Sequence, residues 1–342
     1  SSNAIVEVSV VRRWLLPTSG LLLLLWYLRA PSIDPIDDYH IAMGTMVRMT
    51  LYADPADTTA MIEAGREAIA AIETMASHYD SSSELSHINR TAGRGPVAVS
   101  STMSELLHET WHRTQQSGGH FDPALGLLTS AWGFPEAVQP PEAQQVAQGR
   151  EHSGFHLVDW NGEKIRFLDP MVRLDLGAAA KGFAVDQAVK KLQQAGVAAG
   201  MIEAGGDIRF WGVKPDGKPW RFGVQHPRES ERILVIDDIG LPALATSGDY
   251  EQFFDFEDRR FHHLLDPQTG YPARRAVSAT VWSTSAAAAD IMATAAFVGG
   301  PQVALQMAAA DDSLEVLVFY EKDGRLQRVV SDGVRAHIQG DD

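Results

Sequence analysis

The spacing of hydrophobic residues along the chain predicts several helices. Over residues 58–77, apolar side chains recur near helical spacing, as in Met61, Ile62, Ile69, Ile72 and Met75. Polar capping residues and glycines predict where other helices begin and end. We expect these further helices at residues 84–89, 102–117, 181–195, 285–297 and 303–309.

Alternation of apolar and polar residues predicts many short strands. We expect them at residues 41–52, 155–159, 164–168, 172–176, 200–204, 208–213, 221–225, 232–239, 241–245, 262–265 and 277–283. Residues 314–320 and 326–330 are expected to form a hairpin around Asp323 and Gly324. The polar segment 139–149, rich in Pro and Gln, is expected to be a surface connection.

Strands in runs with intervening helices predict an α+β fold rather than a doubly wound α/β fold. Gly205 and Gly206 lack the full G-x-G-x-x-G spacing, so a Rossmann dinucleotide site is not expected.

The first 30 residues form a distinct segment. Ser1 to Ala4 look like an expression-tag scar, and Arg12 and Arg13 precede an apolar run at residues 14–28. A basic region before a short apolar run is typical of an export signal. We therefore expect residues 1–30 to be a signal peptide or an N-terminal membrane anchor, with an ordinary buried segment as the alternative. Residues 31–342 are expected to form the functional domain.

Composition restricts the chemistry of the protein. The 342 residues include 29 Lys and Arg against 44 Asp and Glu, for a formal net charge of −15. This acidic balance argues against a nucleic-acid partner, and an anionic substrate would need a local metal, lysine or backbone N–H groups. The chain has no cysteine, which excludes disulfides, thiolate metal sites and a lipid anchor on an N-terminal cysteine.

Two segments contain residue types suited to phosphates and metals. Asp290 and Thr294 are four residues apart on a predicted helix, so both oxygens lie on one face, as a Mg²⁺ site requires. Such a pair also arises by chance in many helices. In the segment 175–186, small residues lead from Asp175 to a helix that begins near Lys181, an arrangement suited to an anion. The alternative is a tight crossover with a solvated lysine.

Two other segments contain candidate acid–base and ring-binding groups. His262 and His263 end a predicted strand beside the turn 266–270, and neighbouring strand residues point to opposite faces. One of them is a candidate general base, although a lone histidine is more often structural. Phe121 beside Asp122 can hold a planar ring and its polar edge, although such pairs more often lie in a core or a turn.

In order and spacing, the motifs of this chain resemble those of the ApbE family, the FAD:protein FMN transferases. The motifs are Met43-Gly44-Thr45, 79–86, Phe121-Asp122-Pro123, Trp132-Gly133-Phe134, 175–186, 203–209, 246–250, 263–272 and 290–294. They cover nearly all of the chain after residue 40. The resemblance implies mixed, mainly antiparallel sheets in two closely associated lobes, with FAD in the cleft between them.

The resemblance implies an enzyme that attaches FMN from FAD to a Thr or Ser hydroxyl of a target protein and releases AMP. The reaction would need Mg²⁺, with Mn²⁺ as an alternative. The implied acceptors are exported or membrane-bound redox subunits, such as those of quinone reductases. This places the enzyme in the periplasm or on the outer face of the inner membrane.

The family's functional positions map onto residues of this chain. The resemblance implies that Asp290, Thr294 and the Ala178 carbonyl bind the metal, and that His263 helps to deprotonate the acceptor. Asp290 is counted as catalytic together with His263. The positions that line FAD are Met43, Tyr79, His120, Phe121, Asp122, Asp175, Lys181 and Leu264. Ala293 occupies a position that is acidic in some relatives, so that extra metal ligand is lost here.

Three other functions remain open from the sequence. The same residues suit an Mg²⁺-dependent FAD pyrophosphatase that uses water in place of the protein hydroxyl. A non-catalytic FAD-binding protein would need only the binding positions. A membrane-anchored structural partner of a redox complex is a weaker alternative.

Overall fold

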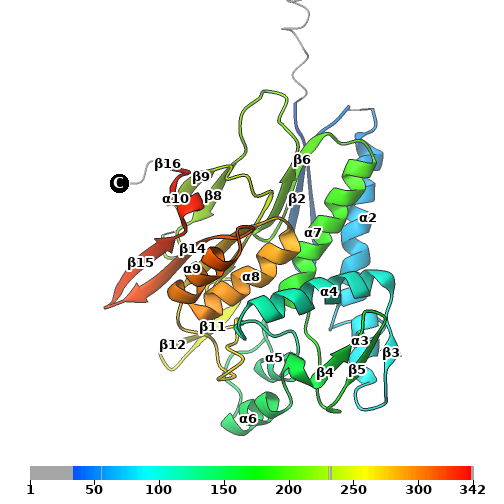
Figure 1. Cartoon of the computed structure of the whole chain (residues 1–342), viewed down its shortest axis with the longest axis vertical. Coiled ribbons are helices and arrows are strands. Elements are labelled where there is room, and N and C mark those ends of the chain that lie inside the picture. Colours follow the sequence, from blue (N-terminus) through cyan, green and yellow to red (C-terminus); the bar gives the residue numbers. More distant parts are fainter. Residues whose placement is uncertain (1–33, 55, 230, 232, 340–342) are drawn as a thin grey trace, which may run out of the picture. The chain divides into compact units, whose positions relative to one another are not determined.

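An eight-stranded antiparallel sheet forms the centre of the fold (Figure 1). The structure is a computed structural model that describes residues 34–54, 56–229, 231 and 233–339. The strand order is β1-β2-β6-β7-β10-β13-β14-β15. These strands are β1 (Ile36–Ala42), β2 (Thr45–Tyr52), β6 (Ala199–Ala204), β7 (Asp207–Trp211), β10 (Ala243–Gly248), β13 (Ser278–Ser283), β14 (Glu315–Lys322) and β15 (Arg325–Val330).

The predicted strand at residues 41–52 is wrong in extent, because the chain reverses within it. Met43 and Gly44 have φ values of 52° and 71° and form a two-residue turn between β1 and β2. Positive φ at both turn residues is the geometry that matches the twist of a hairpin. The sequence does not show β1 clearly, because this edge strand carries Asp37, Asp38 and His40 and is only partly buried.

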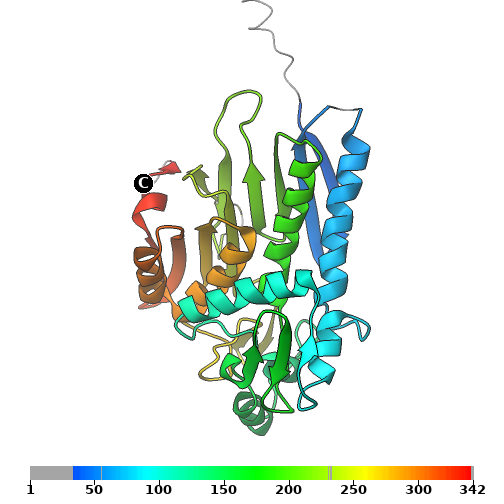
Figure 2. The ribbon, with the colours of Figure 1, turned by 45° about the vertical axis from the view of Figure 1, so that its right-hand side comes forward.

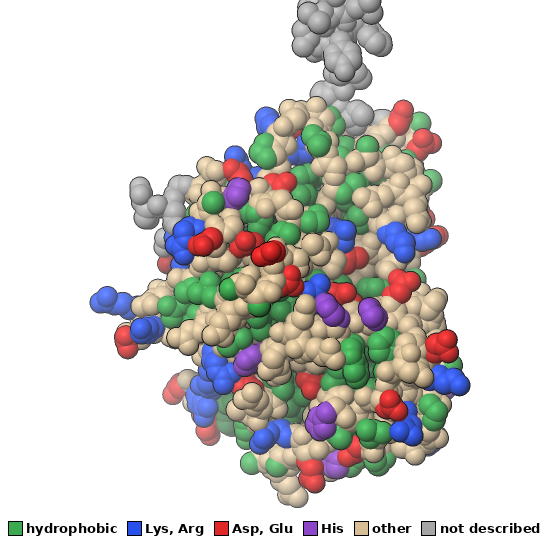
Figure 3. Space-filling view, in the orientation of Figure 1, with side chains coloured by type: hydrophobic (Ala, Val, Ile, Leu, Met, Phe, Trp, Pro, Cys, Tyr) green, Lys and Arg blue, Asp and Glu red, His purple; other side chains and the backbone are tan. Residues whose placement is uncertain are grey.

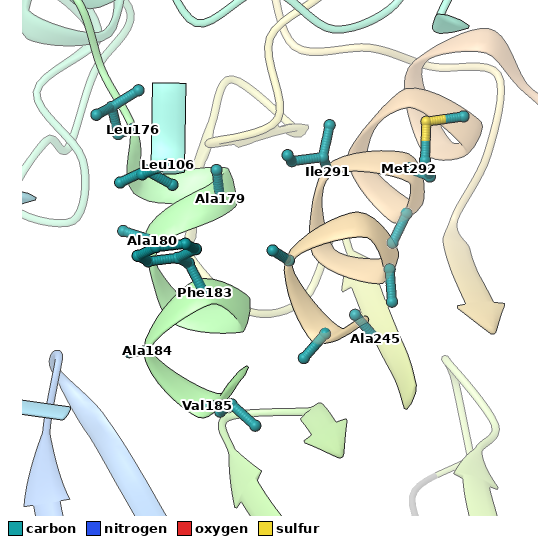
Figure 4. Packing of buried hydrophobic residues seen from close by; sticks show 14 of the residues in the cluster. Leu106, Leu176, Ala179, Ala180, Phe183, Ala184, Val185, Ala245, Ile291 and Met292 are labelled. Atoms are coloured by element: carbon teal, nitrogen blue, oxygen red, sulfur yellow. The ribbon is translucent and has the colours of Figure 1, made fainter. Parts of the chain in front are cut away.

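Helices cover one face of the sheet. Figure 2 shows α2 (Thr58–Ala76) and α7 (Gly177–Gln194) side by side, and α8 (Ala286–Gly299) packs on β10 and β13. The three helices agree with the predicted ones, although α7 begins four residues earlier. Alanines on α7 and α8 leave few bulky side chains between the two helices (Figure 4). Small side chains let the backbones of α7 and α8 come close together.

A small antiparallel sheet covers the other face. Its order is β16-β9-β8, from β8 (Arg221–Gln225), β9 (Ile233–Asp237) and β16 (Ile338–Gln339). Phe222 and Ile236 of this sheet share a hydrophobic cluster with Phe210, Trp282 and other residues of the central sheet. The central sheet is therefore buried on both faces over its middle strands.

The remaining elements lie at one end of the central sheet (Figure 1). They are α3 (Glu84–Arg90), α4 (Ser101–Gln116), α5 (Gly126–Trp132), α6 (Ala143–Glu151), β3 (Val97–Ala98), β4 (Val158–Trp160), β5 (Lys164–Phe167), β11 (Phe253–Phe256) and β12 (Arg259–His262). The other described helices are α9 (Pro301–Ala310), α10 (Asp332–Arg335) and the short 3₁₀ turn η1 (Phe155–Leu157).

Two predictions in these regions are wrong, and one strand was not predicted. Residues 139–149 contain most of α6, which begins at a capping box between Glu142 and Gln145 and buries Val146. Residues 172–176 form no strand, because the side chain of Asn89 bonds both the N–H and the carbonyl of Leu174. The sequence analysis also missed β11, which pairs with β12 in a separate hairpin.

The α+β class with mainly antiparallel sheets is confirmed, and Pro35–Asp342 form one compact unit. The proposed signal or anchor at residues 1–30 lies outside the described residues. Among the helices that the structure describes, none has the length and hydrophobicity to cross a membrane.

Candidate active site

The helix α8 carries Asp290 and Thr294 one turn apart. The Ser285 side chain caps the helix by accepting a hydrogen bond from Ala288 N at 3.1 Å. Every residue of α8 except Thr294 is buried, and the Asp290 side chain is 6% exposed. A buried carboxylate in an alanine-rich helix is costly unless it is paired, so its partners define the site.

The first partner is the backbone of α7. Asp290 Oδ2 accepts a hydrogen bond from Gly182 N at 3.2 Å. A Cβ at residue 182 would overlap the Ala286 carbonyl and lie 2.8 Å from Ala287 N, so this position requires glycine. Near its start, α7 departs from helical geometry at Ala178, which has φ −87° and ψ 18°. A regular helix would direct Gly182 N–H at the Ala178 carbonyl, the predicted backbone metal ligand.

The second partner is Lys181. Its Nζ lies 2.6 Å from Asp207 Oδ2 and 3.7 Å from Asp290 Oδ1. Burial lowers the pKa of Lys181, but the charges of Asp207 and Asp290 outweigh that effect and raise it, so the lysine is an ammonium. Burial and the charge of Asp290 raise the pKa of Asp207 well above its usual value. One cation is thus shared unequally between two buried carboxylates.

The end of β10 and the loop after it add oxygen atoms to this cluster. Ser247 Oγ lies 3.4 Å from Thr294 Oγ1, and Thr294 follows Asp290 by one turn of α8. Burial raises the pKa of Glu251 to about 7, Lys181 lowers it and Asp290 raises it further. Glu251 therefore lies within the electrostatic reach of both charged groups, and it changes charge near neutral pH.

The two adjacent histidines have different surroundings. His262 is buried, with Nε2 at 2.8 Å from the Ala273 carbonyl and Nδ1 accepting from Leu264 N. His263 is half-buried, and its Nδ1 lies 3.3 Å from the Gln252 carbonyl. A carbonyl only accepts, so this bond puts the proton on Nδ1 and leaves Nε2 of His263 as the basic nitrogen. His262 uses both nitrogens within the fold, so His263 is the candidate base.

His263 belongs to the same electrostatic neighbourhood as Lys181. The pKa of His263 is lowered to about 4, chiefly by burial and also by the charge of Lys181, although the Gln252 hydrogen bond and Asp175 act in the opposite direction. The imidazole is therefore neutral at physiological pH, which is the form that can accept a proton.

Several of the predicted flavin-binding residues lie in loops held by backbone contacts. Asp122 accepts hydrogen bonds from Ala124 N at 2.8 Å and Phe155 N at 2.9 Å, so it organises its own loop. Asp175 N donates to Pro123 O at 2.8 Å, which ties this loop to the start of α7. Phe121 and Leu264 are buried at 5% exposure each.

Tyr79, Met43 and His120 have no described polar contact with Asp290 or Lys181. Tyr79 is 72% exposed, and its ring lies 3.8 Å from that of His78, so it offers an open aromatic face. Met43 N donates to Glu73 Oε1 at 2.7 Å. Burial lowers the pKa of His120, whose buried Nδ1 has no hydrogen-bond partner among the described residues.

The described residues include no group of three or more His, Asp or Glu side chains arranged to hold a metal. A cation at Asp290 would need the Thr294 hydroxyl, the Ala178 carbonyl and oxygens of a bound ligand. Mg²⁺ accepts such a set, because it usually keeps few protein ligands and completes its shell with phosphate and water. The residues present therefore fit a magnesium ion that binds together with a phosphate ligand.

Sequence reasoning missed Asp207 and Glu251, which surround Lys181, as members of the site. Asp207 follows Gly205 and Gly206, whose φ values of 58° and 94° reverse the chain between β6 and β7. An acid directly after a glycine turn at the end of a strand was the available signal. No signal in the sequence marked Glu251, because only the fold brings the loop after β10 near Lys181.

On the face seen in Figure 3, basic side chains lie among acidic ones and do not form a continuous basic surface.

Comparison with known proteins identifies the family. The model of the ApbE family matches residues 43–318. The FAD:protein FMN transferase of Vibrio cholerae is 30% identical over 324 residues, or 92% of this chain and 96% of the relative. That of Haemophilus influenzae is 32% identical over 82% of this chain and 86% of the relative.

Solved structures agree with this result. The ApbE protein of Thermotoga maritima has a TM-score of 0.81 and 31% identity, covering 89% of this chain and 99% of that chain. The flavin transferase ApbE from Vibrio cholerae has a TM-score of 0.80 and 29% identity over the same shares. The family model matches most of this chain, and the relatives are similar to it over nearly their whole length. The chain therefore belongs to the ApbE family.

Proposed function

We propose that this chain is an FAD:protein FMN transferase that depends on Mg²⁺, with Mn²⁺ as an alternative. It attaches FMN through a phosphoester bond to a Thr or Ser hydroxyl of a target redox protein and releases AMP. The names of its relatives support the transferase class. The single observation that carries the proposal is the pairing of Lys181 on α7 with the buried carboxylate of Asp290 on α8, which has Thr294 one helical turn further along.

The chemistry is a displacement at phosphorus. The acceptor oxygen forms a bond to the phosphorus of the FMN half of FAD, and the bond from that phosphorus to the bridging oxygen breaks. AMP leaves with the bridging oxygen and its developing negative charge. Lys181 is a permanent cation beside Asp290 and would offset that charge.

Asp290, Thr294 and the Ala178 carbonyl are the residues that would hold the metal. When bound, Mg²⁺ would supply positive charge to the phosphates of FAD. The chain needs such local charge because its net charge of −15 repels an anionic substrate.

His263 is the proposed acceptor of the hydroxyl proton. A Thr or Ser hydroxyl is a weak nucleophile until a base removes its proton. His263 Nε2 is free for this role because Nδ1 is directed at the Gln252 carbonyl. The phosphates of bound FAD would raise the low pKa of this histidine and strengthen it as a base.

The predicted flavin-lining residues are proposed to hold the rest of FAD. The exposed ring of Tyr79 suits stacking on a planar ring system. The acceptor is proposed to be a subunit of a quinone-reductase-type or related electron-transfer complex. This partner places the enzyme in the periplasm or on the outer face of the inner membrane, held there or exported by residues 1–30.

The two alternatives would use the same residues. An FAD pyrophosphatase would transfer FMN to water, and an FAD-binding protein would leave the pyrophosphate intact. The test is to incubate the protein with FAD, Mg²⁺ and a threonine-bearing acceptor domain. Free nucleotides are then separated by chromatography, and flavin that stays on the denatured acceptor is measured by fluorescence.

AMP released in equal amount to acceptor-bound flavin, with both lost in EDTA, supports the transferase. AMP and free FMN without bound flavin contradict transfer to this acceptor and favour the pyrophosphatase. Intact, bound FAD favours the binding protein.

A further inference from the structure

Asp207 is the most deeply buried charged group around the proposed site. Its side chain is 1% exposed, and one oxygen, Oδ2, contacts Lys181 Nζ at 2.6 Å. The other oxygen, Oδ1, is buried and has no hydrogen-bond partner among the described residues. A carboxylate that leaves one oxygen unsatisfied in the protein interior is costly, so the contact with Lys181 is its principal compensation.

Lys181 has two acids within reach but contacts them unequally. The distance to Asp207 is that of a charge-assisted hydrogen bond, whereas the 3.7 Å to Asp290 is too long for one. Asp290 Oδ2 is already bonded to Gly182 N, so Oδ1 is the oxygen that faces Lys181. A displacement of about 1 Å would bring the ammonium into a direct hydrogen bond with that oxygen.

We propose that Asp207 is a positioning residue that holds the Lys181 ammonium away from Asp290, so that the Asp290 carboxylate remains available to a divalent cation. Without Asp207, the ammonium turns to Asp290 and occupies the place of the metal. The inference rests on the proposed function for its metal. It assigns to Asp207 no contact with the metal or with FAD, and its effect passes through Lys181.

A second ion pair between the same two elements provides a matched control. Asp186 on α7 pairs with Arg209 on β7, five residues from Lys181 and two from Asp207. Asp186 also accepts hydrogen bonds from Ala286 N and Ala287 N, at 3.0 and 2.9 Å, and so caps α8. The Asp186→Asn variant therefore weakens the same α7–β7 contact through an acid that pairs with Arg209 instead of Lys181.

The experiment measures metal binding directly, with FAD present and no acceptor. Free Mn²⁺ is followed by electron paramagnetic resonance in the full chain and in its Asp207→Asn, Asp186→Asn, Lys181→Met and Lys181→Met/Asp207→Asn variants. Circular dichroism and thermal unfolding show that each variant is folded. We expect Asp207→Asn to weaken Mn²⁺ binding on the order of tenfold, and Asp186→Asn to lower thermal stability without changing Mn²⁺ binding.

The double variant separates positioning from a general electrostatic or structural effect. If Asp207 acts through Lys181, then Asp207→Asn changes Mn²⁺ binding less than about threefold once Lys181 is replaced by methionine. Lys181→Met alone should bind Mn²⁺ at least as tightly as the parent, which tests the inference even if Asp207→Asn does not fold.

Equal Mn²⁺ affinity of the parent and Asp207→Asn overturns the inference and leaves the proposed function intact. A tenfold loss that persists in the Lys181→Met background also overturns it, because Asp207 would then act without the lysine. If the parent binds no Mn²⁺, the metal in the proposed function fails and the inference fails with it.

Discussion

The carboxylate of Asp290 on α8 accepts a hydrogen bond from the backbone N–H of Gly182 on α7, at 3.2 Å. This bond joins the two helices where a Cβ at residue 182 would overlap the Ala286 backbone. It also fixes Asp290 beside Lys181, the residue before Gly182. The helix packing that buries the core and the placement of the proposed catalytic groups therefore depend on the same contact.

The first prediction concerns this contact. A Gly182→Ala variant should lose at least about 3 kcal/mol of unfolding free energy, because its Cβ would overlap the Ala286 backbone, which cannot move without separating the helices. Urea unfolding measures the change. The control is Gly223→Ala on β8, where the new Cβ meets only a side-chain methyl of the exposed Ile233 at 2.7 Å. A Gly182→Ala variant as stable as the parent would contradict the close packing of α7 and α8.

Asp290 should be essential for transfer but not for binding FAD. At saturating Mg²⁺, Asp290→Asn should lower the rate of FMN transfer at least about 100-fold, because the metal-binding carboxylate is lost. Asp290→Ala should lose transfer as well. Flavin fluorescence quenching should show a much smaller loss of FAD affinity than of transfer rate, because Tyr79 and the loops around it are unchanged. Transfer at the parent rate would remove Asp290 from the metal site.

The pH dependence of transfer should identify His263 as the base. With its pKa lowered to about 4 by burial, His263 is neutral over the whole range from about pH 5 to about pH 8. The Glu251→Gln background removes the other group that titrates near neutral pH. In it, kcat/KM should therefore stay constant over this range and decrease at lower pH. His263→Gln should lower kcat/KM at least about 100-fold and remove the acid limb, whereas His112→Gln, on the exposed side of α4, should change neither.

Folding must be checked at each pH of that experiment. The pKa of His263 is lower in the folded chain than in the unfolded chain, so the unfolded chain binds more protons as the pH falls through about 6.5. The folded state therefore loses stability as the pH falls. An acid limb that His263→Gln leaves unchanged would remove His263 as the base.

Glu251 should control FAD binding near neutral pH when no metal is present. Burial raises its pKa to about 7, so its carboxyl is neutral below this pH and negative above it. The affinity for the anionic FAD should therefore fall as the pH rises through about 7, because the new charge repels the phosphates. Titration in EDTA measures this change. Glu251→Gln should bind FAD equally at both ends of the range, and Glu257→Gln on the β11–β12 turn should behave like the parent. A flat profile in the parent would contradict the placement of Glu251.

Elements with strong local signals could be predicted from the sequence. Ser83 and Ser100 cap α3 and α4 as their types suggest, and Asp323 and Gly324 both adopt positive φ in the β14–β15 turn. The α+β class and the resemblance to the ApbE family are confirmed. These features depend on residues close together in the chain or on the order of motifs along it.

Features set by distant contacts could not be predicted in this way. The strand expected at residues 172–176 is replaced by a segment whose Leu174 backbone is bonded to Asn89, a residue 85 positions away. Glu251 is brought near Lys181 only by the fold, and no local pattern marks it as a site residue. The roles assigned to Ala178, Thr294 and the flavin-lining residues remain predictions, as do the signal or anchor at residues 1–30 and the cellular location.

The most direct test of the account is the intact mass of an acceptor domain after incubation with this protein, FAD and Mg²⁺. The account predicts a gain equal to FMN less one water, absent in EDTA, absent with Asp290→Asn and absent when the acceptor threonine is replaced by valine. An unchanged acceptor mass, with FAD converted to FMN and AMP at the same rate with or without acceptor, would contradict transfer to protein.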